Sequence, residues 1–371
     1  MSQLQKMIQR LCPNGVEFKK LGQICRTITT GKLNANAMVK NGKYPFFTCD
    51  AQPSQIDTYA YDTEAILISG NGSSIGHINY YKGKFNAYQR TYILANFNST
   101  INIFFLFYHL KCKFKQYIMF KSKKGAVPYI TLPILQNFEI PVPPLEVQNE
   151  IVRILDTFTS HTAELQAELQ ARKEQYEYYR NKLLSFDKNN VDVRWIKIGE
   201  FCKILRGKRL TTKELDTNGK FPVFHGGIKP IGFYPHSNRA ANSTMIINVG
   251  ASAGTVGFCK TAFWSSDGCF CFTHNKIVIQ KYLFYVLQSM EISLKSKVRI
   301  AGIPTLDNKN IERLVIPVIS LSEQQRIISI LDKFETLVND LTEGIPAEIA
   351  AVQEQYEYYR NKLLSFPKLE A

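Results

Sequence analysis

Two basic loops recur at matching places in this 371-residue chain, and their side chains have the chemistry to contact phosphate groups. Their members are Lys121, Lys123 and Lys124 in the first loop and Lys295, Lys297 and Arg299 in the second. Each loop lies between an expected helix and a turn closed by proline, which leaves the positive charges free to reach phosphate oxygens. We therefore predict that both loops bind DNA; the alternative is that they are merely solvated.

A second basic group occupies a paired position nearer the start of each half of the chain. It comprises Arg26 and Lys32 in the first half and Arg206, Lys208 and Arg209 in the second. We predict that these side chains also contact DNA, with ordinary surface charge as the alternative. Which of them contact bases does not follow from the sequence, because strand-rich lobes offer no recognition helix.

The net charge of +15 lies on two segments of the chain. Residues 1–144 carry 17 basic and 6 acidic side chains, and residues 191–316 carry 18 and 8. Residues 145–190 carry 6 basic and 8 acidic side chains, and residues 317–371 carry 5 and 9. Two basic segments followed by acidic ones indicate two surfaces that meet a polyanion, most simply nucleic acid.

No set of residues with catalytic spacing stands out. The glycines of ILISGNGSSIG, residues 66–76, lack the dinucleotide-binding spacing, and a strand rather than a helix is expected after them. We interpret this stretch, and GASAGTVG in the second half, as glycine-rich β-turns. His225 and His236 have no counterparts in the first half. We predict that the chain is not an enzyme; a self-contained methyltransferase or nuclease would need motifs that are missing.

The eight cysteines indicate neither disulfides nor a metal site. No CxxC pair occurs, and no histidine lies at zinc-finger spacing, so we interpret all eight as reduced thiols and expect no bound metal. The most apolar run, residues 101–110, is too short to span a membrane, and the N-terminus lacks a signal-peptide core. We expect a cytoplasmic protein without membrane contact.

The basic segments have the composition of strands. Runs of β-branched and aromatic residues predict strands at 24–30, 44–48, 65–69, 75–81 and 91–95, and a helix is expected at about 100–118. The second segment repeats the first with different letters. LGQICRTITTGKL, from residue 21, corresponds to IGEFCKILRGKRL, from residue 198. We therefore predict two lobes, residues 1–144 and 191–316, that share a fold but not its detail.

Each lobe is followed by a segment with helical periodicity. Residues 145–190 place apolar residues at alternating steps of three and four, which predicts one long helix that needs a partner helix. Residues 317–371 continue the pattern after a predicted capping box of Ser320 and Glu323. Gly344 and Pro346 should break or kink this second helix.

The two helical segments end alike. The thirteen residues EQYEYYRNKLLSF occur at 174–186 and again at 354–366, so the chain is two tandem units. The apolar seam includes Tyr176, Tyr179 and Leu183. Side chains that face away from the seam are also the same in both copies of the repeat, and helix packing does not explain why. We predict that six of these dock two copies of one partner: Tyr178, Arg180 and Lys182, with Tyr358, Arg360 and Lys362.

The order of these features resembles the specificity subunit of Type I restriction-modification enzymes. The resemblance covers nearly the full length and is carried by LCPNGVEFKKLG at the opening of a lobe, IPVPPLEVQNEIVRILD at its close, and the repetition of both parts. It implies an α+β fold with two similar β-rich target recognition domains. These domains would be separated by two long helices that form an antiparallel coiled coil, with an internal pseudo-twofold repeat.

The resemblance also implies what the chain does and what it binds. Each lobe would read one half of a bipartite double-stranded DNA site, and the helices would dock two modification (methyltransferase) subunits, which restriction (translocase/nuclease) subunits join. No cofactor is expected on this chain; S-adenosylmethionine, ATP and Mg are expected only on the partner subunits. The alternative is a scaffold that binds nucleic acid without reading its sequence and assembles other proteins.

Overall fold

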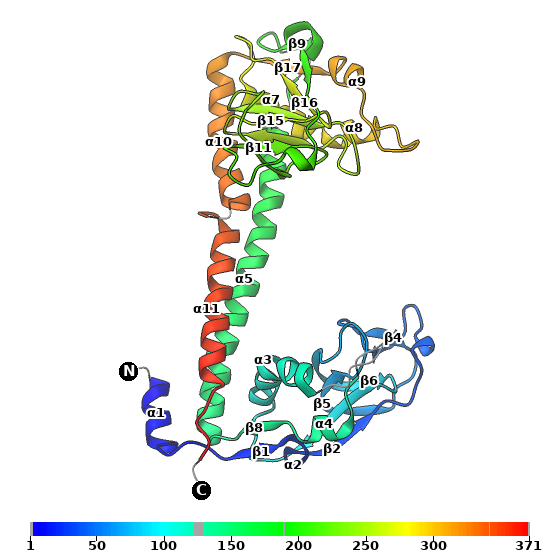
Figure 1. Cartoon of the computed structure of the whole chain (residues 1–371), viewed down its shortest axis with the longest axis vertical. Helices are drawn as coiled ribbons and strands as arrows, with labels where there is room; N and C mark the ends of the chain where they lie inside the picture. The colour runs from blue at the N-terminus through cyan, green and yellow to red at the C-terminus, as the bar shows by residue number, and fades with distance from the viewer. Residues whose placement is uncertain (1–2, 122–128, 188–189, 341, 370–371) are drawn as a thin grey trace. The chain divides into compact units, whose positions relative to one another are not determined.

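The structure is a computed structural model and describes residues 3–121, 129–187, 190–340 and 342–369 (Figure 1). The chain divides into two compact units. Unit 1 is Met1–Leu165 with Ile349–Ala371, and unit 2 is Gln166–Glu348. Unit 1 is discontinuous in sequence because the end of the chain packs with the first lobe. The boundaries between the units therefore fall inside the two helical segments, 145–190 and 317–371, and each unit contains a part of both segments.

A six-stranded sheet forms the centre of unit 1. Its strands in spatial order are β2 (Cys25–Thr30), β7 (Thr91–Phe97), β5 (Tyr61–Ser69), β6 (Ile78–Ala87), β3 (Tyr44–Phe47) and β4 (Ser54–Ile56). Neighbouring strands are antiparallel except β3 and β6, which are parallel. The five predicted strands are confirmed. β6 begins later than predicted because Gly72 and Gly76, both with positive φ, form the predicted turn before it.

Helices and a small strand pair complete unit 1. They are α1 (Gln3–Leu11), α2 (Leu21–Ile24), the 3₁₀ helix η1 (Ala35–Ala37), α3 (Ile103–Lys121) and α4 (Leu132–Gln136), with β1 (Phe18–Lys20) paired to β8 (Glu139–Pro141). α3 confirms the helix predicted at about 100–118. One apolar core joins β5, α3 and the start of the long helix, through side chains such as Ile68, Leu110 and Ile151.

Unit 2 has the same strand order divided over two sheets. One sheet is β10 (Ile204–Arg206), β16 (Cys269–Phe272), β13 (Ser243–Ile247) and β14 (Val256–Cys259); the other is β12 (Gly232–Tyr234), β11 (Phe221–Phe224) and β15 (Trp264–Ser265). β14 and β15 together correspond to β6, since β14 pairs antiparallel with β13 and β15 pairs parallel with β11. The equivalence confirms that the two lobes share one fold.

The remaining elements of lobe two also have counterparts in lobe one. They are β9 (Arg194–Lys197), paired to β17 (Val315–Val318), α6 (Ile198–Phe201), the 3₁₀ helix η2 (Thr212–Glu214), α7 (Gln280–Ser289), α8 (Glu291–Ser296) and α9 (Asn308–Glu312). α7 and α8 together take the place of α3. The core of unit 2 joins α7 to α10 (Leu321–Asn339) through Tyr282, Leu283 and Leu331.

The predicted long helix after lobe one is α5 (Leu145–Leu183). In unit 1 its first part lies against α11 (Ile345–Leu363), which runs in the opposite direction, and Phe158 stacks on Tyr359 at 5.8 Å between ring centres (Figure 1). In unit 2 its last part lies against α10, where Tyr179 stacks on Phe334 at 5.5 Å. Each copy of the thirteen-residue repeat therefore packs in a different unit.

The predicted break in the second helix is confirmed, because α10 ends at Asn339 and α11 begins at Ile345. A Cβ on Gly344 would lie only 2.5 Å from the backbone oxygen of Thr336, so the turn has room for glycine alone. At the start of α10 one half of the predicted capping box forms, since the Oγ of Ser320 accepts a 3.3 Å hydrogen bond from the backbone N of Glu323. The carboxylate of Glu323 pairs with Arg326.

A fully buried glutamine fastens each lobe to the helix that follows it. The Nε2 of Gln148 donates to the carbonyls of Thr100 and Pro143, and its Oε1 accepts from the N of Asn102. Gln324 repeats this pattern in unit 2 with Ile277, Ile319 and Ile279. Both side chains satisfy their buried polar atoms, so the lobe–helix junction is built the same way twice.

All eight cysteines are free thiols, and all lie within the described ranges. Six of the eight are buried, including Cys269 and Cys271 on β16. Across the described residues no group of three histidine, cysteine or carboxylate side chains could hold a metal ion. None of the described helices combines the length and apolar character needed to cross a membrane.

Candidate nucleic-acid interface

Three of the predicted basic residues meet at one hollow in lobe two. Arg206 at the end of β10, Lys297 just after α8, and Arg299 line a cavity of about 470 Å³. Amide side chains share its wall, namely those of Asn248, Asn308 and Asn310. Guanidinium and ammonium groups bind phosphates, and amides pair with base edges, so this cavity has both kinds of group that DNA recognition uses.

Backbone hydrogen bonds fix the wall of this cavity. The N of Leu306 donates to the carbonyl of Asn248 at 2.9 Å, which ties the segment after Thr305 to the end of β13. Asp307 caps α9 by accepting from the N of Lys309 at 3.0 Å, so Asn308 and Asn310 lie in the first turn of a capped helix. The amides of the cavity therefore stand on rigid backbone.

Asn248 marks a clear difference between the two lobes. Its backbone N donates to Gly268 and its carbonyl accepts from Leu306, and in lobe one Gly70 makes the matching bonds to Arg90 and Ile130. A Cβ on Gly70 would lie 2.3 Å from the carbonyl oxygen of Arg90, so lobe one has no space for a side chain there. The two lobes thus present different groups at one equivalent backbone position.

The side chain of Asn248 is buried, with 3% of its surface exposed. Its Oδ1 has no hydrogen-bond partner in the part of the chain that the structure describes. Leaving a buried amide oxygen without a partner is costly, so this oxygen can accept a hydrogen bond from a molecule that enters the cavity. Sequence reasoning missed Asn248, although aligning the glycines after the matching strands would have placed it opposite Gly70.

The other predicted basic residues of lobe two lie outside this cavity. Lys295 is exposed on α8 and forms an ion pair with Glu291 one turn earlier, which offsets its charge. Lys208 and Arg209 are exposed in the loop after β10. Arg206 therefore lines the same cavity as Lys297 and Arg299, whereas Lys208 and Arg209, close to it in sequence, do not line this cavity.

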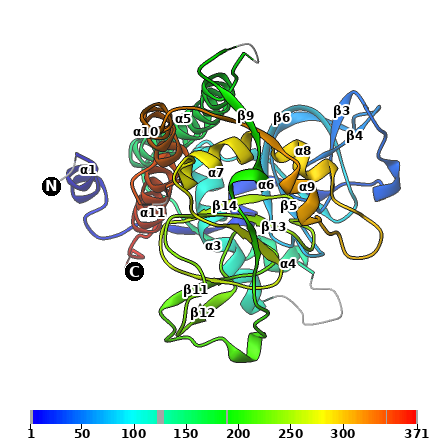
Figure 2. The same ribbon diagram turned by 90° about the horizontal axis from the view of Figure 1, so that it is seen from above.

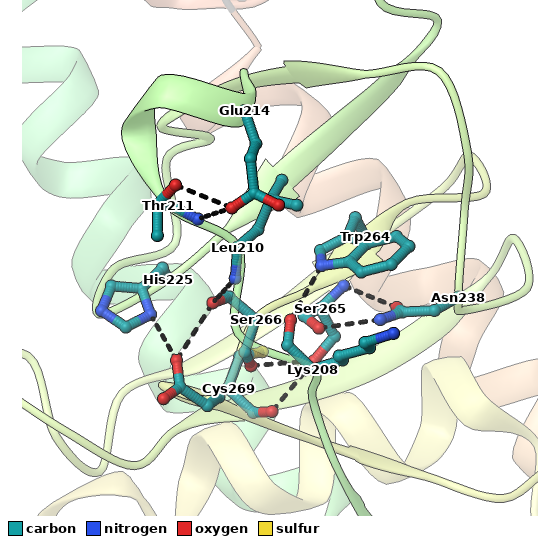
Figure 3. Close-up of polar contacts among 11 residues, drawn as sticks. Lys208, Leu210, Thr211, Glu214, His225, Asn238, Trp264, Ser265, Ser266 and Cys269 are labelled. Atoms are coloured by element: carbon teal, nitrogen blue, oxygen red, sulfur yellow. Dashed lines mark hydrogen bonds and ion pairs between the residues drawn. The ribbon is translucent and has the colours of Figure 1, made fainter. Parts of the chain in front are cut away.

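A network of polar contacts holds the loop that carries Lys208 (Figure 3). The N of Lys208 donates to the carbonyl of Ser265 at 3.0 Å, and the indole Nε1 of Trp264 donates to the carbonyl of Lys208 at 2.9 Å. Asn238 exchanges two hydrogen bonds with the backbone of Ser265, at 2.7 and 2.9 Å.

Trp264 occupies the position that Asn86 has in lobe one, because each of these residues is the first of its strand to pair in the parallel strand pair. This is a second position where the lobes differ.

The same network continues along the loop past Lys208. The carboxylate of Glu214 accepts from the N and the Oγ1 of Thr211, both at 2.7 Å, and these bonds lower the pKa of Glu214 below its ordinary value. Asp267 accepts from the Oγ of Ser266 at 3.1 Å and lies 3.4 Å from Nδ1 of His225. His225 thus lies near a carboxylate, which its isolated place in the sequence did not suggest, although its Nδ1 makes no hydrogen bond to a described residue.

The predicted basic residues of lobe one are less concentrated. Lys121 ends α3 and lines a cavity with Lys20 and Lys113. Arg26 lies near the start of β2 and Lys32 just beyond its end, and both are exposed. Lys123 and Lys124 lie outside the described residues. In the described part of lobe one, Lys121 thus lies beside two lysines that were not predicted, while Arg26 and Lys32 lie elsewhere, and contact of the predicted residues with DNA stays a prediction.

The predicted docking residues have the same local geometry in both copies of the repeat. Lys182 lies 5.6 Å from the ring centre of Tyr178, and Lys362 lies 5.8 Å from that of Tyr358. The two tyrosines are 59% and 60% exposed. These four side chains form two matching surface patches, one in each unit.

The two arginines of the predicted docking set lie deeper than the tyrosines and lysines. Arg180 is 5.4 Å from the ring centre of Tyr176, and Arg360 is 5.3 Å from that of Tyr356. Both are half-buried, and the Nε of each is buried without a hydrogen-bond partner among the described residues. Both arginines stack on tyrosines of the apolar seam, so they pack beneath the exposed patches.

Comparison with known proteins places these features in one family. The sequence profile of the family described as "Type I restriction modification DNA specificity domain" matches residues 13–175 and again 190–351. Two matches in tandem agree with the two lobes. Together they cover most of the chain.

Individual relatives extend over nearly the whole chain. A putative type I restriction enzyme specificity subunit of Haemophilus influenzae is 30% identical, across 95% of this chain and 96% of that protein. The EcoR124I/EcoR124II specificity subunit of Escherichia coli is 32% identical, across 85% and 89%.

Solved structures share the fold. The S subunit of a type I restriction-modification system from M. genitalium matches with a TM-score of 0.65 at 19% identity, over 94% of this chain and 96% of that one. The HsdS subunit of Thermoanaerobacter tengcongensis matches with a TM-score of 0.51 at 18% identity, over 95% and 97%. The resemblance seen in the sequence is thereby confirmed: the chain belongs to the family of type I restriction-modification DNA specificity subunits, a family of non-catalytic recognition subunits.

Proposed function

We propose that the chain reads a bipartite double-stranded DNA site, with one half-site for each lobe. The observation that carries this proposal is the cavity of lobe two, which is lined by three cations, the carboxylate of Asp307 and the buried amide of Asn248. The equivalent place in lobe one is Gly70, without a side chain. The two lobes have the same fold but different side chains at equivalent positions, which suits the recognition of two different half-sites of DNA.

We also propose that two modification subunits dock on the helices, one near each copy of the repeat, and that restriction subunits join this complex. The support is the matching geometry of Tyr178 with Lys182 and Tyr358 with Lys362, since identical surfaces suit identical partners. S-adenosylmethionine, ATP and Mg bind to those partners rather than to this chain. The complex works in the cytoplasm, where its DNA is.

The test measures DNA binding by the chain in complex with its modification subunit. Mapping methylated adenines in the host genome, with and without this gene, identifies the two-part motif. Competition binding then compares a duplex that carries the motif with random duplexes of equal length, at several salt concentrations. We expect a clear preference for the motif and an affinity that falls steeply with salt, because cations displace counterions from phosphates. Equal affinity for random duplexes would refute sequence reading.

Exchange of one lobe separates this proposal from a non-specific scaffold. Replacing residues 16–144 with the corresponding lobe of a relative keeps the helices and their docking surfaces. Sequence reading requires that one half of the methylated motif changes while the other half stays the same. A scaffold that binds any DNA would leave the motif unchanged.

A further inference from the structure

The segment between α8 and α9 forms an arm with a fixed base. Arg299 and Thr305 exchange two backbone hydrogen bonds, at 2.9 and 3.1 Å. The carbonyl of Pro304 also accepts from the N of Gly250 at 2.9 Å, so the glycine-rich turn after β13 holds the returning side of the arm. Both ribbon views show this segment extending from the body of lobe two beside α8 (Figures 1 and 2). The arm, residues 299–305, is thus rigid at its base.

The tip of the arm carries two apolar side chains that are largely exposed among the described residues. Ile300 is 81% exposed and Ile303 is 70% exposed. Between them Gly302 adopts a φ of +80°, and a Cβ at this position would meet no atom within 4 Å. A turn with a fixed base that presents two isoleucines to solvent offers a small apolar contact surface to a partner molecule.

The surroundings of the tip indicate what covers it. Arg299 stands at the base of the arm and Lys297 two residues before it, and both line the cavity that Arg206 and Asn248 share. The apolar tip is therefore joined to a cluster of three cations. Duplex DNA has this pattern of complementary groups, because apolar base stacks lie between two rows of phosphates.

We propose that the arm is a wedge that inserts Ile300 or Ile303 between neighbouring base pairs of the half-site bound by lobe two. Isoleucine is among the apolar residues that proteins insert at base steps, which partly unstacks the step and kinks the duplex. Lys297, Arg299 and Arg206 hold the adjacent phosphates while the wedge enters. This inference rests on the proposed function, because it assigns a role to the arm within the same DNA complex.

The wedge adds a source of specificity that does not need hydrogen bonds to bases. Steps that unstack at low cost, such as TA and CA/TG, accept a wedge more readily than stiff steps. Lobe two would therefore prefer a flexible step at the position of the arm, in addition to the contacts of Asn248. The corresponding segment of lobe one lies outside the described residues, so the inference concerns lobe two alone.

The experiment uses the full chain in complex with its modification subunit and a duplex that carries the methylated motif, labelled with a fluorophore at each end. The wedge variant is Ile300→Ser with Ile303→Ser. The matched control is Ile292→Ser, which changes an isoleucine of α8 that is 87% exposed but lies outside the arm. Thermal unfolding checks that all variants fold, which we expect because none of these side chains is buried.

We expect the wedge variant to bind the motif about tenfold more weakly or worse, because apolar contacts with the stack are lost. Energy transfer between the duplex ends should fall toward the value of free DNA as the kink relaxes. The dependence of affinity on salt should stay that of the unmodified complex, because no cation is removed. Ile292→Ser should match the unmodified complex in all three measurements.

Two results would overturn the wedge. One is a wedge variant that binds and kinks the motif like the unmodified complex. The other is a wedge variant that fails to assemble with the modification subunit, which would make the arm a protein contact. Failure of the proposed function is a separate outcome, since the unmodified complex would then bind the motif no better than random DNA.

Discussion

Tyr108 in α3 donates a hydrogen bond from its hydroxyl to Oδ1 of Asp156 in α5, at 2.5 Å. Lobe two repeats the contact with Tyr285 and Asp332. Burial, with the neighbouring carboxylate, raises the pKa of Tyr108 above its ordinary value, so the hydroxyl stays a donor at physiological pH. Together with the buried glutamines, this bond joins each lobe to a long helix.

We expect Tyr108→Phe to lower the free energy of unfolding of unit 1 by about 1 kcal/mol, since one hydrogen bond is lost and the exposed Asp156 regains water. Urea denaturation measures the change. Tyr129→Phe is the control, because the hydroxyl of Tyr129 makes no hydrogen bond to a described residue and its loss should change the free energy of unfolding little. Equal losses in both variants would contradict the prediction.

The stability of unit 1 should depend on pH through His109. Burial and the nearby Lys113 lower the pKa of His109 from 6.5 to about 4. Between these values the unfolded chain binds a proton that the folded chain does not, so stability falls as the pH drops. From pH 7 to pH 5 this group alone removes about 2 kcal/mol of stability.

The measurement is urea denaturation at pH 7 and pH 5 for the unmodified chain and for His109→Val, which has the residue that lobe two carries at the equivalent position, Val286. The variant should lose less stability on acidification than the unmodified chain. His161→Gln, at an exposed site on α5, is the control and should leave the pH dependence as it was. Parallel pH profiles for His109→Val and the unmodified chain would refute the assignment.

Changing the amide in the lobe-two cavity should alter one half-site only. We expect Asn248→Ala to weaken discrimination at one base pair of that half-site by about 1–3 kcal/mol, the typical value of a good amide–base contact. Competition binding with duplexes that carry single base-pair changes measures it. The salt dependence of binding should stay constant, and the half-site read by lobe one should be unaffected. Loss of discrimination in both half-sites would indicate a general folding defect.

Charge reversal on the repeated patches should change the number of docked partners. We expect Lys182→Glu and Lys362→Glu each to remove one modification subunit, because each patch serves one copy. The double variant should remove both, and native mass spectrometry counts the subunits in each complex. Lys173→Glu, at an exposed site of α5 outside the repeat, is the control. Two bound subunits in the double variant would show that the repeat serves helix packing alone.

Gly344 should be intolerant of any side chain. A Cβ there would meet the carbonyl oxygens of Thr336 and Asp340 at 2.5 and 2.8 Å. We expect Gly344→Ala to lower the free energy of unfolding of unit 2 by about 1–3 kcal/mol, the usual cost of overpacking. Thermal unfolding measures this change as a lower melting temperature. Gly227→Ala is the control, since a Cβ at Gly227 meets no atom within 4 Å. Similar melting temperatures for both variants would contradict the steric argument.

Local patterns predicted most of the elements but not their partners. The periods of the apolar residues placed α3, α5 and the strands of lobe one, and Gly344 with Pro346 placed the break between α10 and α11. The strand order did not follow, because β3 pairs with β6 across a separation that no local signal encodes. The sequence also did not predict that each long helix ends in the core of the other lobe's unit. Leu364, after the second helix, lies in the core of unit 1, and Leu184, after the first, lies in the core of unit 2.

The candidate site could be predicted only in part. Charge counting identified Arg206, Lys297 and Arg299, because excess charge is visible without a structure. It placed Lys295 with them, whereas an ion pair with Glu291 sets that residue apart. Asn248 is uncharged and common in turns, so its importance appears only when its burial and missing partner are known.

The closure of unit 1 by the end of the chain has a consequence for synthesis on the ribosome. The N of Val16 donates to the carbonyl of Pro367 at 3.0 Å, and Leu364 is buried in the core of unit 1. Unit 2 is continuous in sequence, so all its residues are synthesised before Ile349, where the second part of unit 1 begins. Lobe one, although translated first, is completed only by residues 349–371, so a nascent chain that has not reached them presents a finished second lobe beside an unfinished first one.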